Sequence, residues 1–498
     1  MSTAPIVSKV WSFCHMLRDD GVGYGDYLEQ LTYLIFLKMA DEYSRPPYSR
    51  DVGISPEHKW PQLKSRKGAE LEDHYVATLR ALGARPGLLG QIFIGAQNKI
   101  QDPAKLYRLI AMIDDADWVA MGADTKGDIY ESLLERNAED TKSGAGQYFT
   151  PRALIRAMVE CVRPEPGKRI ADPACGTGGF FLAAYDFITN PRNFKLDKEQ
   201  KAFLKHEAFH GNEIVANTRR LCLMNMFLHN IGEIEGGAPI SANDSLIADD
   251  GERFDYVLAN PPFGKKSSMS FTNEEGGQQK DELTYNRQDF WAATSNKQLN
   301  FVQHIRTMLK TTGVAAVVVP DNVLFEGGAG EMIRRKLLDS TDLHTILRLP
   351  TGVFYAQGVK ANVIFFDNRE ASPNPWTEQV WYYDYRTNIR HTLKKKPMRL
   401  EHLSDFIACY NPRNRHERKA TWNEGAAPEG RWRSYSYEEL AARDKASLDI
   451  FWLKDKSLAD LDNLPEPDDL AAEIIENLEA GLGSFRKVLA GLERSASR

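Results

Sequence analysis

A glycine-rich segment carries the first sign of chemistry in this sequence. Residues 170–180 read IADPACGTGGF, the pattern of a short strand, a tight turn and the start of a helix. Such glycines let the backbone pass close to a bound molecule, and the amides at a helix N-terminus face its polar groups. The segment lacks the GKS or GKT of a Walker A loop and the spacing of the dinucleotide motif. Gly176, Thr177, Gly178 and Gly179 therefore indicate a nucleotide-like cofactor site, with a purely structural turn as the alternative.

Two acidic residues stand at the ends of the next predicted strands. Glu213, in HGNEI, follows residues 207–212, and its side chain is placed to accept hydrogen bonds from both hydroxyls of a ribose. Asp244, in SANDSL, follows residues 240–243 and is placed to accept from the amine of an adenine. Taken alone, each also fits a helix-start or turn carboxylate.

The tetrapeptide NPPF, Asn260, Pro261, Pro262 and Phe263, follows the apolar segment FDYVLA. Two consecutive prolines remove two backbone donors, so this corner presents oxygen acceptors. The exocyclic amine of adenine is a poor nucleophile because its lone pair is delocalised into the ring. Acceptance of its two N–H bonds by the Asn260 side-chain oxygen and the Pro261 carbonyl would turn that lone pair outward. Phe263 offers a stacking face for a base drawn from the duplex, and a rigid loop is the alternative interpretation.

Strands and helices alternate around these residues. This order predicts an α/β fold with a parallel, doubly wound sheet that has helices on both faces. Strands are expected at 168–172, 207–212, 240–243, 254–259, 314–319, 343–349 and 362–366. Helices are expected at 153–162, 178–189, 214–229, 300–309 and 330–338.

The flanking regions differ from this alternating core. Residues 1–140 show helical periodicity, including apolar faces at 6–17 and 27–35, with loops at 46–56 and 83–90. Residues 264–298 are polar without an apolar period and are expected to form a mobile loop, a lid or a substrate-contacting segment. An amphipathic helix is expected at 468–493, with the spacing of a coiled-coil or bundle seam that packs either on this chain or on another subunit. We therefore divide the chain into a helical domain (1–140), a catalytic domain (141–390) and a C-terminal extension (391–498).

Together these motifs resemble the S-adenosyl-L-methionine (AdoMet)-dependent amino-methyltransferases of DNA. The resemblance rests on IADPACGTGGF, Glu213, Asp244 and NPPF in this order, each at the end of a predicted strand. The segment QYFTPR at 147–152 looks like that family's additional AdoMet-binding motif. The helical N-terminal region, YDYRTN, DFIACY, GRWRSYSYEEL and the final helix resemble the M subunit of type I restriction-modification systems.

The resemblance implies a Rossmann-like methyltransferase that moves a methyl group from AdoMet to the N6 amine of an adenine flipped out of DNA. It implies that AdoMet is surrounded by Gln147, Tyr148, Phe149, Thr150, Pro151, Arg152, Asp172, Gly176, Thr177, Gly178, Gly179, Glu213 and Asp244. It implies that Asn260, Pro261, Pro262 and Phe263 hold the target base. Direct transfer to an amine requires no metal ion, no enzyme thiol and no serine–histidine triad.

The charge of the chain bears on its partners. The formal net charge of −6 is unfavourable for a protein that must hold DNA unaided. In the resembled family a separate specificity subunit selects the DNA sequence. The resemblance therefore implies two M subunits with one specificity subunit, optionally joined by the restriction-translocase subunit, and residues 468–493 are the candidate contact. No apolar stretch approaches the roughly twenty residues of a membrane span, and the N-terminus lacks a secretory signal, so we expect a cytoplasmic protein.

Three alternatives stay open from the residues. Cytosine N4 presents an amine with the same chemical problem as adenine N6. An RNA base or a protein glutamine is also a planar amine that an NPPF corner can serve. A catalytically silent assembly subunit would keep the fold without the activity, although the glycine turn and NPPF are both intact.

Overall fold

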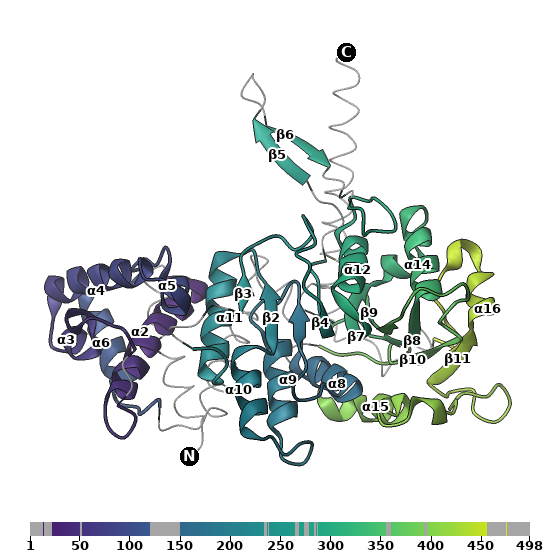
Figure 1. Ribbon diagram of the computed structural model, residues 1–498, viewed down its shortest axis with the longest axis horizontal. Coiled ribbons are helices and arrows are strands. Elements are labelled where there is room, and N and C mark those ends of the chain that lie inside the picture. The colour runs from purple at the N-terminus through teal and green to yellow at the C-terminus, as the bar shows by residue number, and fades with distance from the viewer. Residues whose placement is uncertain are drawn as a thin grey trace.

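The computed structural model describes residues 13, 22–49, 52–119, 150–233, 237, 239–263, 268–272, 278–282, 285, 287–354, 360–392, 396–455 and 475. A group of N-terminal helices lies beside a nine-stranded sheet that carries helices on both faces (Figure 1). The expected helices at 6–17 and 468–493 fall outside the described residues, apart from positions 13 and 475, and so do Gln147, Tyr148 and Phe149.

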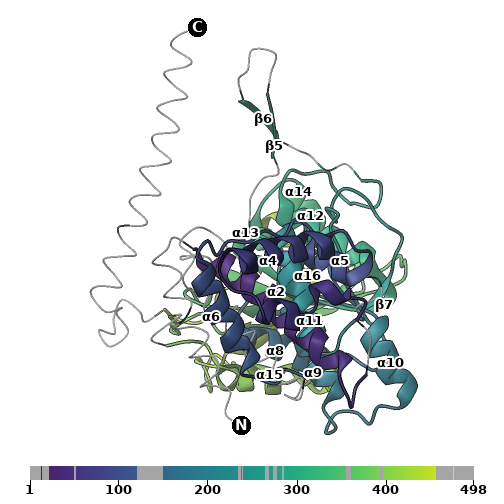
Figure 2. The ribbon, with the colours of Figure 1, turned by 90° about the vertical axis from the view of Figure 1, so that its left-hand side faces the viewer.

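The N-terminal helices pack around α2 (Tyr24–Ser44), which is buried along all of residues 27–42. This burial explains why α2 is apolar on most of its circumference instead of along one stripe. The expected loop at 83–90 is shorter than predicted, because α5 begins at Gly87. Figure 2 looks onto this group of helices. The surrounding elements are the 3-10 turn Pro56–His58, α3 (Trp60–Lys64), α4 (Gly68–Gly83), α5 (Gly87–Phe93) and α6 (Pro103–Asp114).

The large sheet has the strand order β11-β10-β8-β9-β7-β4-β1-β2-β3. The segment from β7 through β4, β1 and β2 to β3 is parallel, as predicted. The expectation of a wholly parallel sheet is wrong at β9, which runs antiparallel to both β7 and β8, and at β11, which runs antiparallel to β10. The strands are β1 (Ile170–Asp172), β2 (Phe209–Asn212), β3 (Ile240–Ser241), β4 (Phe254–Ala259), β7 (Leu309–Pro320), β8 (Thr341–Arg348), β9 (Ala361–Asn368), β10 (Gln379–Asp384) and β11 (Trp432–Ser436).

Helices cover both faces of this sheet, which confirms the doubly wound fold class. Side chains alternate between two cores along β4: Tyr256 and Leu258 belong to one, Val257 and Ala259 to the other. The first core contains residues of α8 (Arg152–Val162), α9 (Gly179–Thr189), α10 (Lys198–His206), α11 (Ala216–Leu228) and α15 (Ser404–Tyr410). The second contains residues of α12 (Lys297–Met308), α13 (Asp321–Phe325), α14 (Ala329–Ser340) and α16 (Tyr437–Ala441).

The polar segment 264–298 departs from the prediction of a loop. It contains an antiparallel pair of strands, β5 (Ser268–Thr272) and β6 (Gln278–Glu282), and the first residues of α12. This hairpin projects from the body of the protein (Figure 1). A two-stranded hairpin away from the core needs no buried face, so its sequence shows no apolar period.

Several elements were not expected from the sequence. Strand β11 lies within 391–498, for which only an extension was predicted, and it forms one edge of the large sheet. The division at residues 140 and 390 stays a prediction. Helix α10 was also missed, although Asp197 and Gln200 form a capping box at its start.

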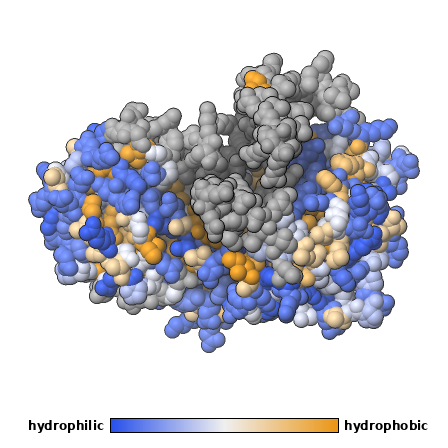
Figure 3. All heavy atoms as spheres, turned by 90° about the horizontal axis from the view of Figure 1, so that it is seen from above, coloured by the Kyte–Doolittle hydropathy of each residue, from blue (hydrophilic) through white to orange (hydrophobic). Residues whose placement is uncertain are grey.

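The outer surface is mainly hydrophilic where the described residues can be seen from above, with apolar residues in small groups (Figure 3). Within the described part of the chain, no helix has both the length and the apolar character needed to cross a membrane.

Candidate active site

A cavity of about 500 Å³ lies at the edge of the sheet where β1, β2 and β4 end. This edge is where ligands bind in doubly wound folds. The predicted residues that line it are Thr150, Arg152, Asp172, Gly176, Thr177, Gly179, Glu213, Asp244, Asn260 and Pro262. Pro151, Gly178, Pro261 and Phe263 adjoin these residues in the chain but are not part of the lining.

The glycine turn begins directly after β1. The Asp172 carboxylate accepts a hydrogen bond from the Ala174 amide at 3.0 Å, and the Cys175 amide donates to the Asn212 carbonyl of β2 at 3.0 Å. Gly178 has a φ of +84°, and a Cβ there would lie 2.9 Å from the Cys222 sulfur. Glycine is therefore required at this position both by conformation and by space.

Glu213 faces this turn from the end of β2. Its Oε2 accepts from the Gly176 amide at 3.1 Å, and its Oε1 accepts from the Val215 amide at 2.8 Å. Its own amide donates to the Ser241 carbonyl at 2.9 Å, which ties it to β3. The carboxylate is thus fixed between the glycine turn and α11, and each oxygen keeps a further lone pair for a ligand.

The cavity holds two carboxyl groups, of Asp172 and Glu213, that interact with each other. Asp172 is 1% exposed, and burial raises the pKa of its carboxyl to about 8, with a further rise from the charge of Glu213. Burial also raises the pKa of Glu213. The two carboxyls disfavour each other's ionisation when no cation is near. A positively charged ligand would stabilise their ionised forms, so this part of the cavity favours such a ligand.

Asp244 lies in the loop after β3, and residues that follow the β5–β6 hairpin form hydrogen bonds to this loop. Its Oδ1 accepts from the Leu246 amide at 2.9 Å, and its Oδ2 accepts from the Tyr285 hydroxyl at 3.4 Å. Arg287 donates to the Ser245 carbonyl at 3.2 Å. Tyr285 and Arg287 were missed because they belong to the polar segment in which no periodic pattern marks a contact.

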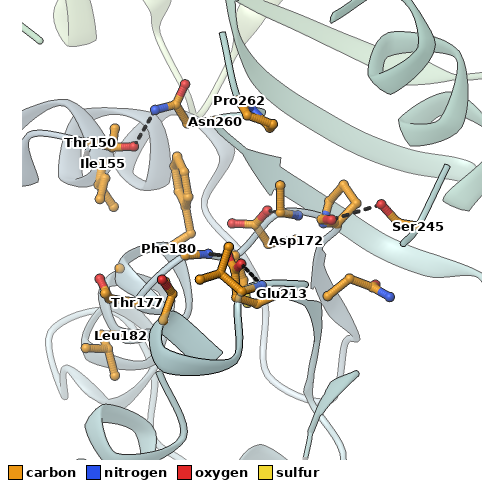
Figure 4. Close-up of a pocket in the computed structure, with 18 of the residues that line it drawn as sticks. Thr150, Ile155, Asp172, Thr177, Phe180, Leu182, Glu213, Ser245, Asn260 and Pro262 are labelled. Atoms are coloured by element: carbon orange, nitrogen blue, oxygen red, sulfur yellow. Dashed lines mark hydrogen bonds between the residues drawn. The ribbon is translucent and has the colours of Figure 1, made fainter. Parts of the chain in front are cut away.

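Asn260 follows β4 and is 7% exposed. Its Nδ2 donates to the Thr150 hydroxyl at 2.8 Å, whereas its Oδ1 is buried and has no hydrogen-bond partner among the residues that the structure describes. Figure 4 shows the amide with its nitrogen toward Thr150 and its oxygen turned away. The amide oxygen is therefore the atom left to accept from a ligand. Unpaired buried acceptors are costly, so a donor at this position would be favoured.

Phe263 packs edge-on against Phe354, with ring centroids 5.6 Å apart. Phe354 follows β8, so two sheet segments meet at the NPPF corner. Phe354 is 2% exposed, so its ring is held by the surrounding core and in turn holds the Phe263 ring in place. Phe354 was not predicted, because one aromatic residue in a loop gives no specific signal.

Helix α11 joins the cavity to the N-terminal helices. Asn225 donates to the Thr177 carbonyl of the glycine turn at 3.0 Å. On the same helix, Arg220 is 3% exposed, pairs with Glu29 of α2, and donates to the Ile92 carbonyl at 2.7 Å. A single helix therefore carries contacts to the glycine turn and to the helical domain.

Further lining residues were not predicted. Ile214 is 62% exposed and lies beside Glu213, and an apolar side chain that stays exposed at a cavity is suited to a flat ring. The pattern HGNEI contained this signal, because an isoleucine follows the acidic residue directly. The other additions include Ile155, Arg156, Phe180, Val215, Ser245, Lys297 and Phe301.

Comparisons with known proteins agree with this arrangement. Residues 121–437 match the family model described as N-6 DNA Methylase, and residues 6–113 match the model described as HsdM N-terminal domain. The methylase subunit of the type I restriction enzyme StySPI from Salmonella potsdam is 40% identical over 100% of this chain and 98% of the relative.

Solved structures give the same relation. The crystal structure of the EcoKI M protein shares 36% identity and covers 98% of this chain and 96% of its own, with a TM-score of 0.54. A chain from a type I restriction-modification system shares 25% identity and covers 99% of both chains, with a TM-score of 0.72. With a family model over most of its length and a full-length relative at 40% identity, the chain belongs to the family of type I restriction enzyme methylase subunits.

Proposed function

We propose that this chain transfers a methyl group from AdoMet to the N6 amine of an adenine in DNA, as the modification subunit of a type I complex. The observation that carries the proposal is the buried Asn260 oxygen, which accepts no hydrogen bond within the described part of the chain and lies at the donor-poor NPPF corner. An amine with two N–H bonds supplies what this oxygen lacks. Family membership supports the same conclusion independently.

The cavity fits AdoMet in size and in charge. A volume of about 500 Å³ lies in the usual range for small-molecule sites. Asp172 and Glu213 together favour a ligand with positive charge, and AdoMet carries a sulfonium and an ammonium group, while the free lone pairs of Glu213 are left to accept from the ribose hydroxyls. Gly176 and Gly179 leave space for the close approach of a ligand, and Asp244 with Ile214 offers an acceptor and an apolar face for an adenine ring. When bound, AdoMet supplies an activated methyl group.

The residues of the chain act on the amine of the base. The Asn260 Oδ1 and the Pro261 carbonyl accept its two N–H bonds, which withdraws the nitrogen from conjugation and exposes its lone pair. Pro261 and Pro262 contribute no backbone donors that would compete for these acceptors. Phe263 stacks on the flipped base and is itself fixed by Phe354. The excess proton of the methylated amine leaves to solvent.

We further propose that the chain acts in a complex with a specificity subunit, a second copy of itself and, for restriction, a translocase subunit. The net charge of −6 supports this, because a partner with basic surfaces would supply much of the grip on DNA. The relatives named above are described as subunits of restriction enzymes. Residues 468–493 are the proposed contact, and Gln147, Tyr148 and Phe149 are proposed to lie near AdoMet with Pro151 and Arg152.

The test is Asn260→Ala in the complex with the specificity subunit. We expect turnover at saturating AdoMet to fall at least about a hundredfold, because a preorganised acceptor is lost, while AdoMet affinity stays within about threefold. Asn374→Ala, an exposed asparagine outside the cavity lining, serves as the matched control and should retain full turnover.

The product decides between the candidate substrates. The DNA is labelled with methyl-tritiated AdoMet and digested to nucleosides, and label in N6-methyladenine supports the proposal. Label in N4-methylcytosine would redirect it to the other amine, and an absence of transfer by the unmodified complex would indicate a silent assembly subunit. A comparable loss of AdoMet affinity in Asn260→Ala would contradict the role given to that residue.

A further inference from the structure

We infer that Thr150 is a positioning residue for methyl transfer, because it holds the Asn260 amide in the orientation that leaves the amide oxygen free. The inference rests on the function proposed above. The resemblance to the family places Thr150 among the residues around AdoMet. In the structure, the Thr150 hydroxyl instead accepts a hydrogen bond from Asn260, 110 positions later in the chain.

Thr150 is itself firmly placed. It is 8% exposed and directly precedes Pro151, the residue that caps the start of α8. The Pro151 carbonyl accepts from the Leu154 and Ile155 amides at 2.9 and 3.1 Å. Leu154 is fully buried, and α8 packs against α9 and β7. The hydroxyl therefore comes from the end of a rigid helix and not from a loose loop.

The chemistry of the contact decides which end of the amide is available. A hydroxyl oxygen can accept from an amide nitrogen or donate to an amide oxygen. In this structure it accepts from Nδ2, so the Asn260 oxygen keeps its acceptor capacity. In the opposite orientation, the Asn260 oxygen would accept from the Thr150 hydroxyl. The two N–H groups of the amide would then face the amine of the base, which needs acceptors for its own N–H groups. Thr150 and Asn260 thus form one unit at the target base.

The experiment compares Thr150→Val, which keeps the shape and removes the hydroxyl, with Thr150→Ser, which keeps the hydroxyl. Both are studied in the complex with the specificity subunit. Turnover is measured at saturating AdoMet and DNA, AdoMet affinity by equilibrium dialysis, and folding by the thermal midpoint. We expect Thr150→Val to lower turnover about tenfold or more with AdoMet affinity within about twofold, and Thr150→Ser to restore turnover to within about threefold.

A double variant separates this role from a contact with the cofactor. When Asn260→Ala is already present, Thr150→Val should cause no further loss of turnover, because the group that it positions is gone. Equal losses in both backgrounds, or a tenfold loss of AdoMet affinity with turnover retained, would overturn the inference. Thr150→Ser behaving like Thr150→Val at an unchanged thermal midpoint would overturn it too. Failure of Asn260→Ala alone to lower turnover would refute the role proposed for Asn260, and absence of methyl transfer by the unmodified complex would instead refute the proposed function.

Discussion

Replacement of Asp172 by asparagine gives a direct test of the electrostatics of the cavity. Asparagine keeps the size of the side chain and an oxygen that can accept from the Ala174 amide, so the hydrogen bond at 3.0 Å is preserved. It removes only the ionisable group. Burial raises the pKa of Asp172 to about 8, whereas an aspartate in an unfolded chain titrates near about 3.9.

The sign and size of the effect follow from these two pKa values. At a pH between these two pKa values, Asp172 carries a proton in the folded chain and has released it in the unfolded chain. The free energy of unfolding therefore falls progressively as the pH rises through this range. Each pH unit costs about 1.4 kcal/mol until the folded carboxyl itself ionises. From about pH 6 to about pH 8, the wild-type chain should lose about 2 kcal/mol through this group. Asp172→Asn should not lose this contribution.

The assay is urea unfolding of both proteins without ligand across this pH range. The stability of the variant minus that of the wild type should increase by about 2 kcal/mol toward alkaline pH, since all other titrating groups are shared. A cationic ligand favours the ionised carboxylate, so AdoMet affinity of the wild type should also rise with pH, and Asp172→Asn should lack this dependence. Parallel stability curves for the two proteins would refute the argument that Asp172 is held protonated.

Three further substitutions test other parts of the site. Gly178→Val should weaken AdoMet binding about tenfold or more in calorimetry, because the φ of +84° and the Cys222 sulfur 2.9 Å from a Cβ exclude a side chain. Gly425→Val is the surface control, and equal AdoMet affinities of the two variants would contradict this account. Arg220→Met should lower the free energy of unfolding by about 3 kcal/mol, because the buried Glu29 carboxylate loses its ion-pair partner and keeps only the hydrogen bond from the Tyr33 hydroxyl among the described contacts, whereas Arg335→Met at an exposed pair should cost under about 1 kcal/mol. Asp244→Asn should reduce AdoMet affinity about tenfold with turnover at saturation retained, because a charged acceptor is lost; a fall in saturated turnover alone would place Asp244 elsewhere in the mechanism.

The central strands could be predicted because local composition and burial agree there. FDYVLA is apolar on both sides, as a strand covered by helices must be, and β4 occupies the predicted residues 254–259. By contrast, β11 is WRSYS, with four of its five residues only partly buried, so its apolar signal is weak. Its place in the sheet comes from pairing with β10. The reversed direction of β9 is likewise a property of its neighbours β7 and β8, because a strand's composition does not encode its direction.

The candidate site shows a similar division. Glu213, Asp244 and Asn260 could be predicted from residue types at strand ends, since the carboxyl ends of parallel strands meet at one edge of the sheet. Asp172 was predicted only through the family resemblance. Their supporting contacts did not follow. Tyr285 reaches Asp244 from a polar segment after a hairpin, and Phe354 reaches Phe263 from beyond β8. Such contacts join residues far apart in the chain, and no local pattern records them.

The position of Thr150 distinguishes between two roles, contact with the cofactor and action at the target base, that the sequence alone does not distinguish. A motif upstream of the glycine turn can contact either the cofactor or the target base, because both ligands meet at one cavity. The hydroxyl lies 2.8 Å from the Asn260 nitrogen, so its chemical effect falls on the acceptor for the amine. Asp172 and Glu213 act at the charged end of the same cavity. We therefore expect substrate activation and cofactor binding to depend on different polar groups of one cavity, so that single substitutions lower turnover and AdoMet affinity independently.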